Sequence, residues 1–343
     1  MPTRRALLTS ATAILALALA PPATAQSDRP MPVVATFSIL GDMVKRIGGE
    51  RVAVTTLVGP DGDTHVYQPT PADARAVSEA RILVVNGLQF EGWLDRLIDA
   101  SGFRGIRVVA TDGIEPIVFD DEHDRGGHAE EAGHGHDDEH AEAATHDHDD
   151  DDDDEAHAKA GHDDHHHGAF DPHAWQSLRN AAVYVDNITA ALAKADPGNA
   201  GVFYRNREAY AAEIETLDSE IREILARLPA ASRTVVTSHD AFRYFGRDYG
   251  LTFIAPQGLS TESEASAKDV ARLIRQIRDG GIRAVFVENI GDPRLLGRIA
   301  DETGATIGGT LYPGALSGPD GPAPTYLDMI RHNAMTLARA LTS

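Results

Sequence analysis

Short runs of β-branched and aliphatic residues alternate with amphipathic segments along most of the chain. Four of these runs precede residue 110 and four follow residue 230. They lie at 33–37, 52–58, 82–85, 106–109, 234–237, 251–254, 284–287 and 307–311. Apolar residues at helical spacing separate them, for example over 70–80 and 90–100. Such alternation is typical of a parallel sheet covered by helices, so the chain is predicted to contain two α/β units.

A long amphipathic helix is predicted between the two units, over residues 196–229. Asp196 followed by Pro197 is a typical helix start, and Pro229 ends the pattern. Its apolar stripe consists of Phe203, Tyr210, Ile214, Leu217, Ile221, Ile224 and Leu228. At a rise of 1.5 Å per residue, about 30 residues extend roughly 45 Å, more than a typical domain helix needs. We therefore expect an α/β protein of two lobes, each a mainly parallel sheet covered by helices, joined by one long backbone helix; a long helix within a single domain is the alternative.

Residues 1–25 have the features of a secretory signal peptide. A pair of arginines precedes an apolar run over 11–20, and an Ala-Thr-Ala sequence at 23–25 provides a small-residue cleavage site. The apolar run is too short to be interpreted as a membrane-spanning helix. We expect export to the periplasm, by either the general secretory or the twin-arginine route. In the remaining chain, 26–195 is the predicted N-terminal lobe and 230–343 the predicted C-terminal lobe.

The charge of the chain is concentrated in one segment of the N-terminal unit. The whole chain has a formal net charge of −22, and residues 120–168 alone contribute −18. So acidic a protein is a poor partner for nucleic acid or for an anionic membrane surface. The segment has no aromatic residues and contains six consecutive aspartates at 149–154. Because it has little apolar surface to bury, we expect a disordered surface loop.

The same segment contains 12 of the 16 histidines. Imidazoles mixed with carboxylates bind borderline divalent metals, weakly where no geometry is fixed. We therefore interpret the segment as an auxiliary metal-binding loop; the alternative, a merely solvating acidic insertion, accounts for the acids but not for the histidines. Its candidate ligands include His134, His136, His140, His146, His148, His165, His166 and His167.

Four histidines remain outside the acidic segment. His65 and His239 each come shortly after a predicted strand, and His173 is the first histidine after the acidic segment. Ligands bind beyond the carboxyl ends of parallel strands, and three neutral imidazoles meeting in a cleft would form a zinc site with an open fourth position. His332 lies in the terminal helix pattern and is interpreted as a surface or helix-packing residue. The chain has no cysteine, which excludes thiolate ligands and disulfides.

The sequence around these histidines resembles the cluster A-I metal-binding solute-binding proteins, the periplasmic components of ABC importers for zinc and manganese. The matching segments are 62–71 (GDTHVYQPTP), 171–175 (DPHAW), 238–245 (SHDAFRYF), 249–251 (YGL), 264–267 (EASA) and 325–329 (TYLDM). The resemblance extends over residues 31–342. It implies two similar lobes joined by a long helix, with a metal ion held between them by His65 and His173 of the N-terminal lobe and His239 of the C-terminal lobe. It also implies an ABC permease in the inner membrane as a partner.

The donor set favours zinc. In manganese-type members of the family the third ligand resembles a carboxylate, whereas this chain has His239 there, and nitrogen donors favour Zn²⁺ over Mn²⁺. Many members have an aspartate fourth ligand after the last strand, and Gly314 replaces it here. We assign the fourth position to water, with a loop histidine, Asp320 or Glu288 as alternatives. The candidates for hydrogen-bonding support of the ligand imidazoles are Glu288, Asp240 and Asp63.

These observations predict a monomeric periplasmic protein that binds Zn²⁺ with high affinity and delivers it to an ABC importer. A periplasmic zinc metallochaperone or buffer, which would serve other periplasmic zinc proteins, is one alternative, and a manganese-type binding protein is another. A zinc enzyme is disfavoured: three histidines and a water also form hydrolytic sites, but no motif in the sequence offers a general base or a nucleophile.

Overall fold

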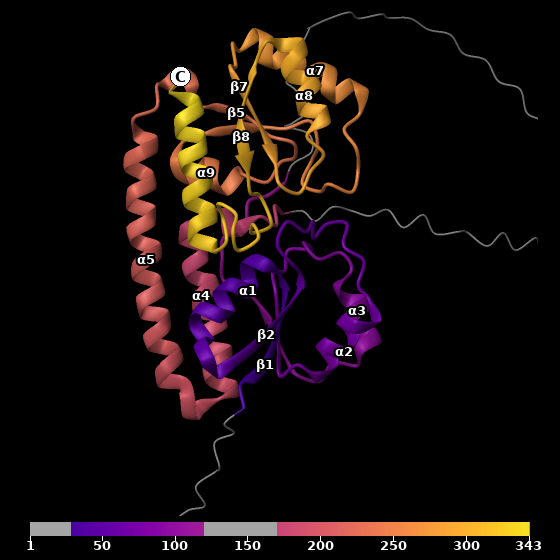
Figure 1. Cartoon of the computed structure of the whole chain (residues 1–343), viewed down its shortest axis with the longest axis vertical. Helices are drawn as coiled ribbons and strands as arrows, with labels where there is room; N and C mark the ends of the chain where they lie inside the picture. The colour runs from indigo at the N-terminus through magenta and orange to yellow at the C-terminus, as the bar shows by residue number, and fades with distance from the viewer. Residues whose placement is uncertain (1–28, 120–169, 343) are drawn as a thin grey trace, which may run out of the picture.

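The structure is a computed structural model and describes residues 29–119 and 170–342. The predicted signal peptide and the predicted His-rich loop lie outside these residues. Two α/β lobes lie one above the other, and one long helix runs alongside both of them (Figure 1). Within the described ranges, no helix combines the length and the apolar character needed to cross a membrane.

The N-terminal lobe contains a sheet of four parallel strands in the order β2-β1-β3-β4. The strands are β1 (Met31–Phe37), β2 (Val52–Val58), β3 (Ile82–Val85) and β4 (Ile106–Val109). Its helices are α1 (Ser38–Gly48), α2 (Pro71–Glu79), α3 (Leu94–Ser101) and α4 (Leu178–Ala195). In β1, Val33 pairs with Val54 on one side and with Ile82 on the other. The central strands β1 and β3 are buried almost throughout, which explains why they consist of nearly continuous apolar runs.

The C-terminal lobe repeats this arrangement with the order β6-β5-β7-β8, again all parallel. Its strands are β5 (Thr234–Val236), β6 (Thr252–Ile254), β7 (Ala284–Glu288) and β8 (Thr306–Leu311). Its helices are α6 (Arg243–Tyr249), α7 (Ala267–Asp279), α8 (Arg294–Thr303) and α9 (Tyr326–Leu341). The predicted fold class, two parallel sheets covered by helices, is confirmed.

The long helix is α5 (Ala200–Ala226), which has 27 residues. A short 3₁₀ turn (Pro197–Asn199) precedes it, and the Asp196 side chain accepts a hydrogen bond from the Asn199 N–H. Its buried stripe consists of Phe203, Tyr210, Ile214, Leu217, Ile221 and Leu225. The helix packs against α1 and α4 of the N-terminal lobe and against α6 and α9 of the C-terminal lobe. It therefore contacts both lobes, as expected of a connecting helix.

Buried contacts also join the lobes directly. The Trp175 indole N–H donates to the Pro313 carbonyl at 2.8 Å, and the Tyr326 hydroxyl donates to the Trp175 carbonyl at 2.6 Å. The larger apolar core extends from the strands of the N-terminal lobe along α5 and α9 into the C-terminal lobe, and a smaller core lies beneath α7 and α8. A shared core favours small relative movements of the lobes over a wide hinge opening.

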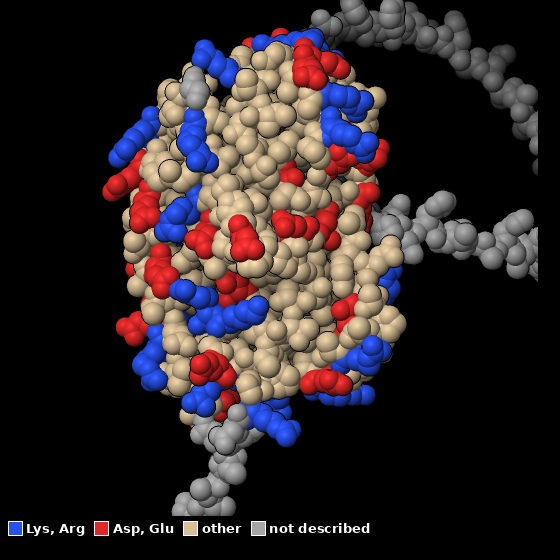
Figure 2. Space-filling view, viewed as in Figure 1, with Lys and Arg blue, Asp and Glu red and all other residues tan. Residues whose placement is uncertain are grey.

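Acidic and basic side chains are interspersed on the face that carries α5 and α9 (Figure 2). Arg46 of α1 pairs with Glu213 of α5, and Arg331 of α9 pairs with Glu220 of α5. On this face the two signs of charge therefore largely compensate each other.

Candidate metal centre

Three imidazoles from distant parts of the chain meet between the lobes. The ring centroids of His65 and His173 are 5.4 Å apart, and His239 lies 5.6 Å from His65 and 5.3 Å from His173. One ring nitrogen from each histidine lies within 4.8 Å of the other two. All three side chains are buried. Sequence reasoning predicted this set, and the fold brings it together.

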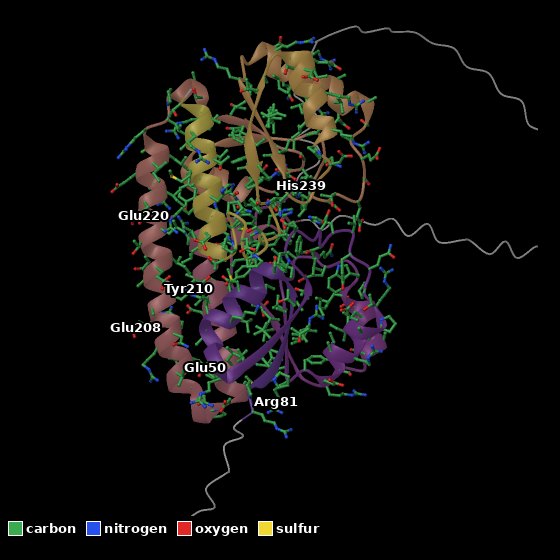
Figure 3. The ribbon with its side chains drawn as sticks, viewed as in Figure 1. Glu50, Arg81, Glu208, Tyr210, Glu220 and His239 are labelled. Atoms are coloured by element: carbon green, nitrogen blue, oxygen red, sulfur yellow. The ribbon has the colours of Figure 1, made fainter. Side chains whose placement is uncertain are left out.

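Parallel-strand topology explains why these residues meet. His65 follows β2, and His239 follows β5, so both lie beyond the carboxyl ends of their strands. His173 immediately precedes a 3₁₀ turn, Ala174–Gln176, that leads into α4. In Figure 3 the labelled His239 lies on the side of its lobe that faces the N-terminal lobe.

A buried carboxylate orients His173. Asp171 Oδ1 lies 2.8 Å from His173 Nδ1 and also accepts the backbone N–H of His173 at 2.9 Å. With Nδ1 facing Asp171, Nε2 faces the centre and lies 3.3 Å from Nε2 of His65. Burial, together with the nearby His239 and Arg243, lowers the pKa of His173 well below its ordinary value. The imidazole is therefore neutral near pH 7, as a metal ligand must be.

The Asp171 carboxyl is itself strongly perturbed. Burial raises its pKa to about 7, although the hydrogen bond from the backbone of His173 acts in the opposite direction. Sequence reasoning did not single out Asp171 as a supporting residue. The available signal was its position two residues before a candidate ligand, the spacing at which an Asp side chain can accept the backbone N–H of the second following residue.

A second carboxylate orients His239 from a different strand. Glu288, the last residue of β7, places Oε2 2.6 Å from His239 Nδ1, and its Oε1 accepts the backbone N–H groups of Ser238 at 3.0 Å and of His239 at 3.2 Å. Burial by itself would lower the pKa of His239, but the Glu288 charge and hydrogen bond outweigh it, so the pKa is raised. His239 Nε2 is buried and has no hydrogen-bond partner among the described residues. An unpaired buried nitrogen costs free energy, and a metal ion would satisfy it.

Aromatic rings form a wall of the centre. Phe90 packs edge-on against His65 with the ring centroids 4.9 Å apart, and Trp175 packs edge-on against His173 with the centroids 5.3 Å apart. Phe90 and Trp175 also pack against each other, with their ring centroids 4.7 Å apart. They restrict the imidazole orientations and exclude water from one side of the centre.

Access to the centre is on the side of His65. A cavity of about 650 Å³ opens beside this histidine and is lined by residues of both lobes, including Trp93 and Leu259. His65 is 9% exposed, whereas His173 and His239 are fully buried. An ion entering from solvent would meet His65 first.

The remaining predicted site residues occupy distinct places. Asp63 accepts the backbone N–H of His65 at 2.9 Å, so it supports the ligand loop rather than the imidazole ring. Asp240 accepts a hydrogen bond from the Arg243 guanidinium at 2.5 Å. His332 lies on α9, where its Nε2 is 3.0 Å from the Thr310 carbonyl oxygen, which agrees with a packing role. The loop histidines from His134 to His167 lie outside the described residues.

Gly314, which replaces the aspartate that many members of the resembling family have, lies beside the aromatic wall. A Cβ atom at Gly314 would be 3.8 Å from Trp175 and 4.0 Å from Phe90, which is ordinary contact distance. Asp320, considered as a displaced ligand, is exposed in a turn. Glu288, the other acid considered, engages His239 Nδ1 with one oxygen and two backbone N–H groups with the other. This arrangement favours support of His239 over direct ligation.

Comparisons with known proteins match nearly the whole chain. Residues 33–340 match the family model "ZnuA: Zinc-uptake complex component A periplasmic". The chain is 31% identical over 307 residues to the iron-binding protein YfeA of Yersinia pestis, covering 90% of this chain and 85% of that protein. It is 31% identical over 320 residues to the manganese-binding lipoprotein MntA of Bacillus subtilis, covering 92% and 91%.

Solved structures agree with this match. The periplasmic zinc-binding protein TroA of Treponema pallidum is similar with a TM-score of 0.73 and 27% identity, covering 91% of this chain and 99% of that chain. A Mn-bound periplasmic metal-binding protein of Candidatus Liberibacter asiaticus is similar with a TM-score of 0.70 and 29% identity, covering 90% and 98%. The names of these relatives include iron, manganese and zinc, so similarity establishes the family and leaves the metal open.

Proposed function

This chain belongs to the ZnuA family of zinc-uptake components, and we propose that it captures Zn²⁺ in the periplasm and delivers it to the permease of an ABC importer. The observation that carries the proposal is the buried set of His65, His173 and His239, in which His239 Nε2 has no partner among the described residues. The family consists of uptake components, not enzymes, which agrees with the interpretation drawn from the sequence.

The donor set supports zinc over manganese. Three neutral imidazoles suit a borderline metal, whereas Mn²⁺ gains less from nitrogen ligands and favours oxygen. Gly314 adds no carboxylate at the position where many family members have one. We assign the fourth coordination position to water, which three-histidine zinc sites commonly retain.

The distribution of the ligands supports delivery rather than permanent storage. His65 follows a strand of the N-terminal lobe, and His239 follows a strand of the C-terminal lobe. A small movement of one lobe relative to the other would therefore separate the two histidines. Release would then require no unfolding of either sheet. A permease that favours the separated arrangement would shift the protein toward release.

The test uses the mature protein from residue 26 without an affinity tag, because a histidine tag would itself bind zinc. Metal content is measured after purification, and Zn²⁺ and Mn²⁺ affinities are measured by competition with chelators of known affinity. We expect one tight Zn²⁺ equivalent and much weaker Mn²⁺ binding. Equal affinities would overturn the zinc assignment, and absence of any tight equivalent would overturn the metal-binding function.

Single substitutions assign that equivalent to the centre. His65→Ala, His173→Ala and His239→Ala should each weaken Zn²⁺ binding by orders of magnitude. His332→Ala is the matched control, since His332 lies on α9 and is not one of the three clustered histidines. Wild-type affinity in all three variants would place the tight site elsewhere.

A further inference from the structure

The loop that carries His65 begins with a tight turn in an unusual backbone conformation. The Gly62 N–H donates to the Gly59 carbonyl at 3.2 Å and closes a four-residue turn with Pro60 at its second position. Asp61, at the third position, has a φ of +54°, where glycine or asparagine is usual. This conformation costs free energy, so contacts outside the turn must help to maintain it.

Those contacts come from the opposite lobe. The Asp61 N–H donates to the Leu316 carbonyl at 2.8 Å, and the Asn289 side-chain amide donates to Asp61 Oδ1 at 2.9 Å. Asn289 directly follows Glu288, the residue that orients His239. The N-terminal loop that carries His65 is thus attached beside the support of the C-terminal ligand.

A third contact from the C-terminal lobe, made by Thr261, is transmitted to His65 by the side chain of Asp63. Asp63 Oδ1 accepts the backbone N–H of His65 at 2.9 Å, and Asp63 Oδ2 accepts the hydroxyl of Thr261 at 2.5 Å. Thr261 belongs to the loop between β6 and α7 of the C-terminal lobe. A hydroxyl of one lobe and a ligand backbone of the other therefore share one carboxylate. Hydrogen bonds to a charged acceptor are about twice as strong as neutral ones.

We propose that Thr261 is a positioning residue for metal retention: through Asp63 it holds the His65 loop against the C-terminal lobe, with Asn289 providing a parallel contact through Asp61. This inference rests on the proposed function. His65 and His239 are ligands from different lobes, so separating the lobes breaks the metal site and these contacts together. The contacts thus slow metal release without touching the ion.

The test compares zinc release from the full mature protein and its variants. Thr261→Val removes the hydroxyl at nearly constant volume, and Thr261→Ser restores it. After loading with one equivalent of Zn²⁺, release into excess EDTA is followed by stopped-flow mixing. Loss of one charge-assisted hydrogen bond predicts roughly tenfold faster release for Thr261→Val and a wild-type rate for Thr261→Ser.

Thr306→Val is the matched control. The Thr306 hydroxyl donates to the Arg283 carbonyl at 3.2 Å at the start of β8, whereas Thr261 follows the end of β6 in the same C-terminal sheet. Loss of the Thr306 hydroxyl should therefore leave the release rate unchanged. Equal release from Thr261→Val and wild type would overturn the inference, and so would failure of Thr261→Ser to restore the rate. The unfolding midpoint of the metal-free variants identifies any general loss of stability.

A second measurement does not depend on zinc. Amide hydrogen exchange in the metal-free protein reports directly on the N–H groups of Asp61 and His65. We expect faster exchange of both in Thr261→Val than in Thr306→Val, and equal exchange would refute the contact. Wild-type protein that binds no zinc would instead refute the proposed function, while exchange would still test the attachment of the loop.

Discussion

Nδ1 of His239 lies 2.6 Å from Oε2 of Glu288, although the two residues are 49 positions apart in the chain. The other oxygen of Glu288 accepts two backbone N–H groups of the loop that carries His239. One carboxylate thereby fixes both the loop and the ring, and it directs Nε2 toward the centre. His173 has an equivalent partner in Asp171, only two residues away. The imidazoles of His173 and His239 are thus oriented by buried acids.

Glu288→Gln is expected to weaken zinc binding by about 10- to 100-fold, the effect typical of losing an outer partner of a ligand histidine. Glutamine keeps the size of the side chain but removes the negative charge that increases the basicity of the His239 ring. Competition titration at pH 8 or above measures the effect with little interference from protons. Glu302→Gln, at an exposed position of α8, should retain wild-type affinity. An unchanged affinity in Glu288→Gln would show that the pair does not orient the ligand.

Zinc affinity should fall as the pH is lowered, and the raised pKa of His239 should set the start of the decrease. A protonated imidazole cannot bind metal, and a pKa above the ordinary value of about 6.5 means that protonation begins closer to neutral pH. His173 has a lowered pKa and remains neutral over this interval. Calorimetry in buffers of different ionisation enthalpy should detect proton release on zinc binding near pH 7.

Glu288→Gln provides the control for this pH dependence. Without the carboxylate, burial should lower the pKa of His239, so the decrease in affinity should move to lower pH and the proton release near pH 7 should diminish. An identical pH profile in the two proteins would assign the titration to another group.

Gly314→Asp is expected to reduce the preference for zinc over manganese. A Cβ at this position would be at ordinary contact distance from Trp175 and Phe90, the rings that pack against His173 and His65, so it meets no clash there. An added carboxylate would supply an oxygen donor, which benefits Mn²⁺ more than a further nitrogen would. The ratio of Zn²⁺ to Mn²⁺ affinity is measured by competition. Gly314→Ala fills the same space without a donor and should leave the ratio unchanged.

The strands could be predicted from their runs of β-branched and aliphatic residues. The signal is clearest in a central strand such as Ile82–Val85, which is buried on both faces and therefore apolar throughout, whereas outer strands such as β2 and β8 are partly exposed. The helix α4 was not among the predicted elements. The signals for it are present in the sequence, because its buried residues Tyr184, Val185, Ile188 and Leu192 recur at helical spacing and Ser177 caps its first turn by accepting the Asn180 N–H.

The three ligands could be predicted because strand ends and motif resemblance agree on them. Their supports could be predicted only in part. Glu288 ends a strand, so its position was foreseeable, whereas Asp240 is adjacent to His239 in sequence but bonds Arg243. Contacts such as Thr261 to Asp63 depend on how two loops of different lobes meet, which local pattern does not encode.

Deletion of residues 120–168 is expected to leave the tight zinc site intact and to remove additional weak equivalents. The chain on either side of this segment is already paired, because Val118 and Phe170 form an antiparallel bridge and the Asp171 N–H donates to the Ile117 carbonyl at 2.9 Å. A short linker can therefore close the gap without displacing His173.

The number of Zn²⁺ equivalents bound is measured by calorimetry for the full mature protein and for the deletion variant, and the two numbers are compared. Twelve histidines among twenty carboxylates should add weak equivalents in the full protein, and because these depend on long-range attraction they should weaken as salt is added. The buried ion should be far less sensitive to salt. Loss of the tight site on deletion would mean that a histidine of the segment is the fourth ligand, and the assignment of that position to water, which rests on Gly314, would then be wrong.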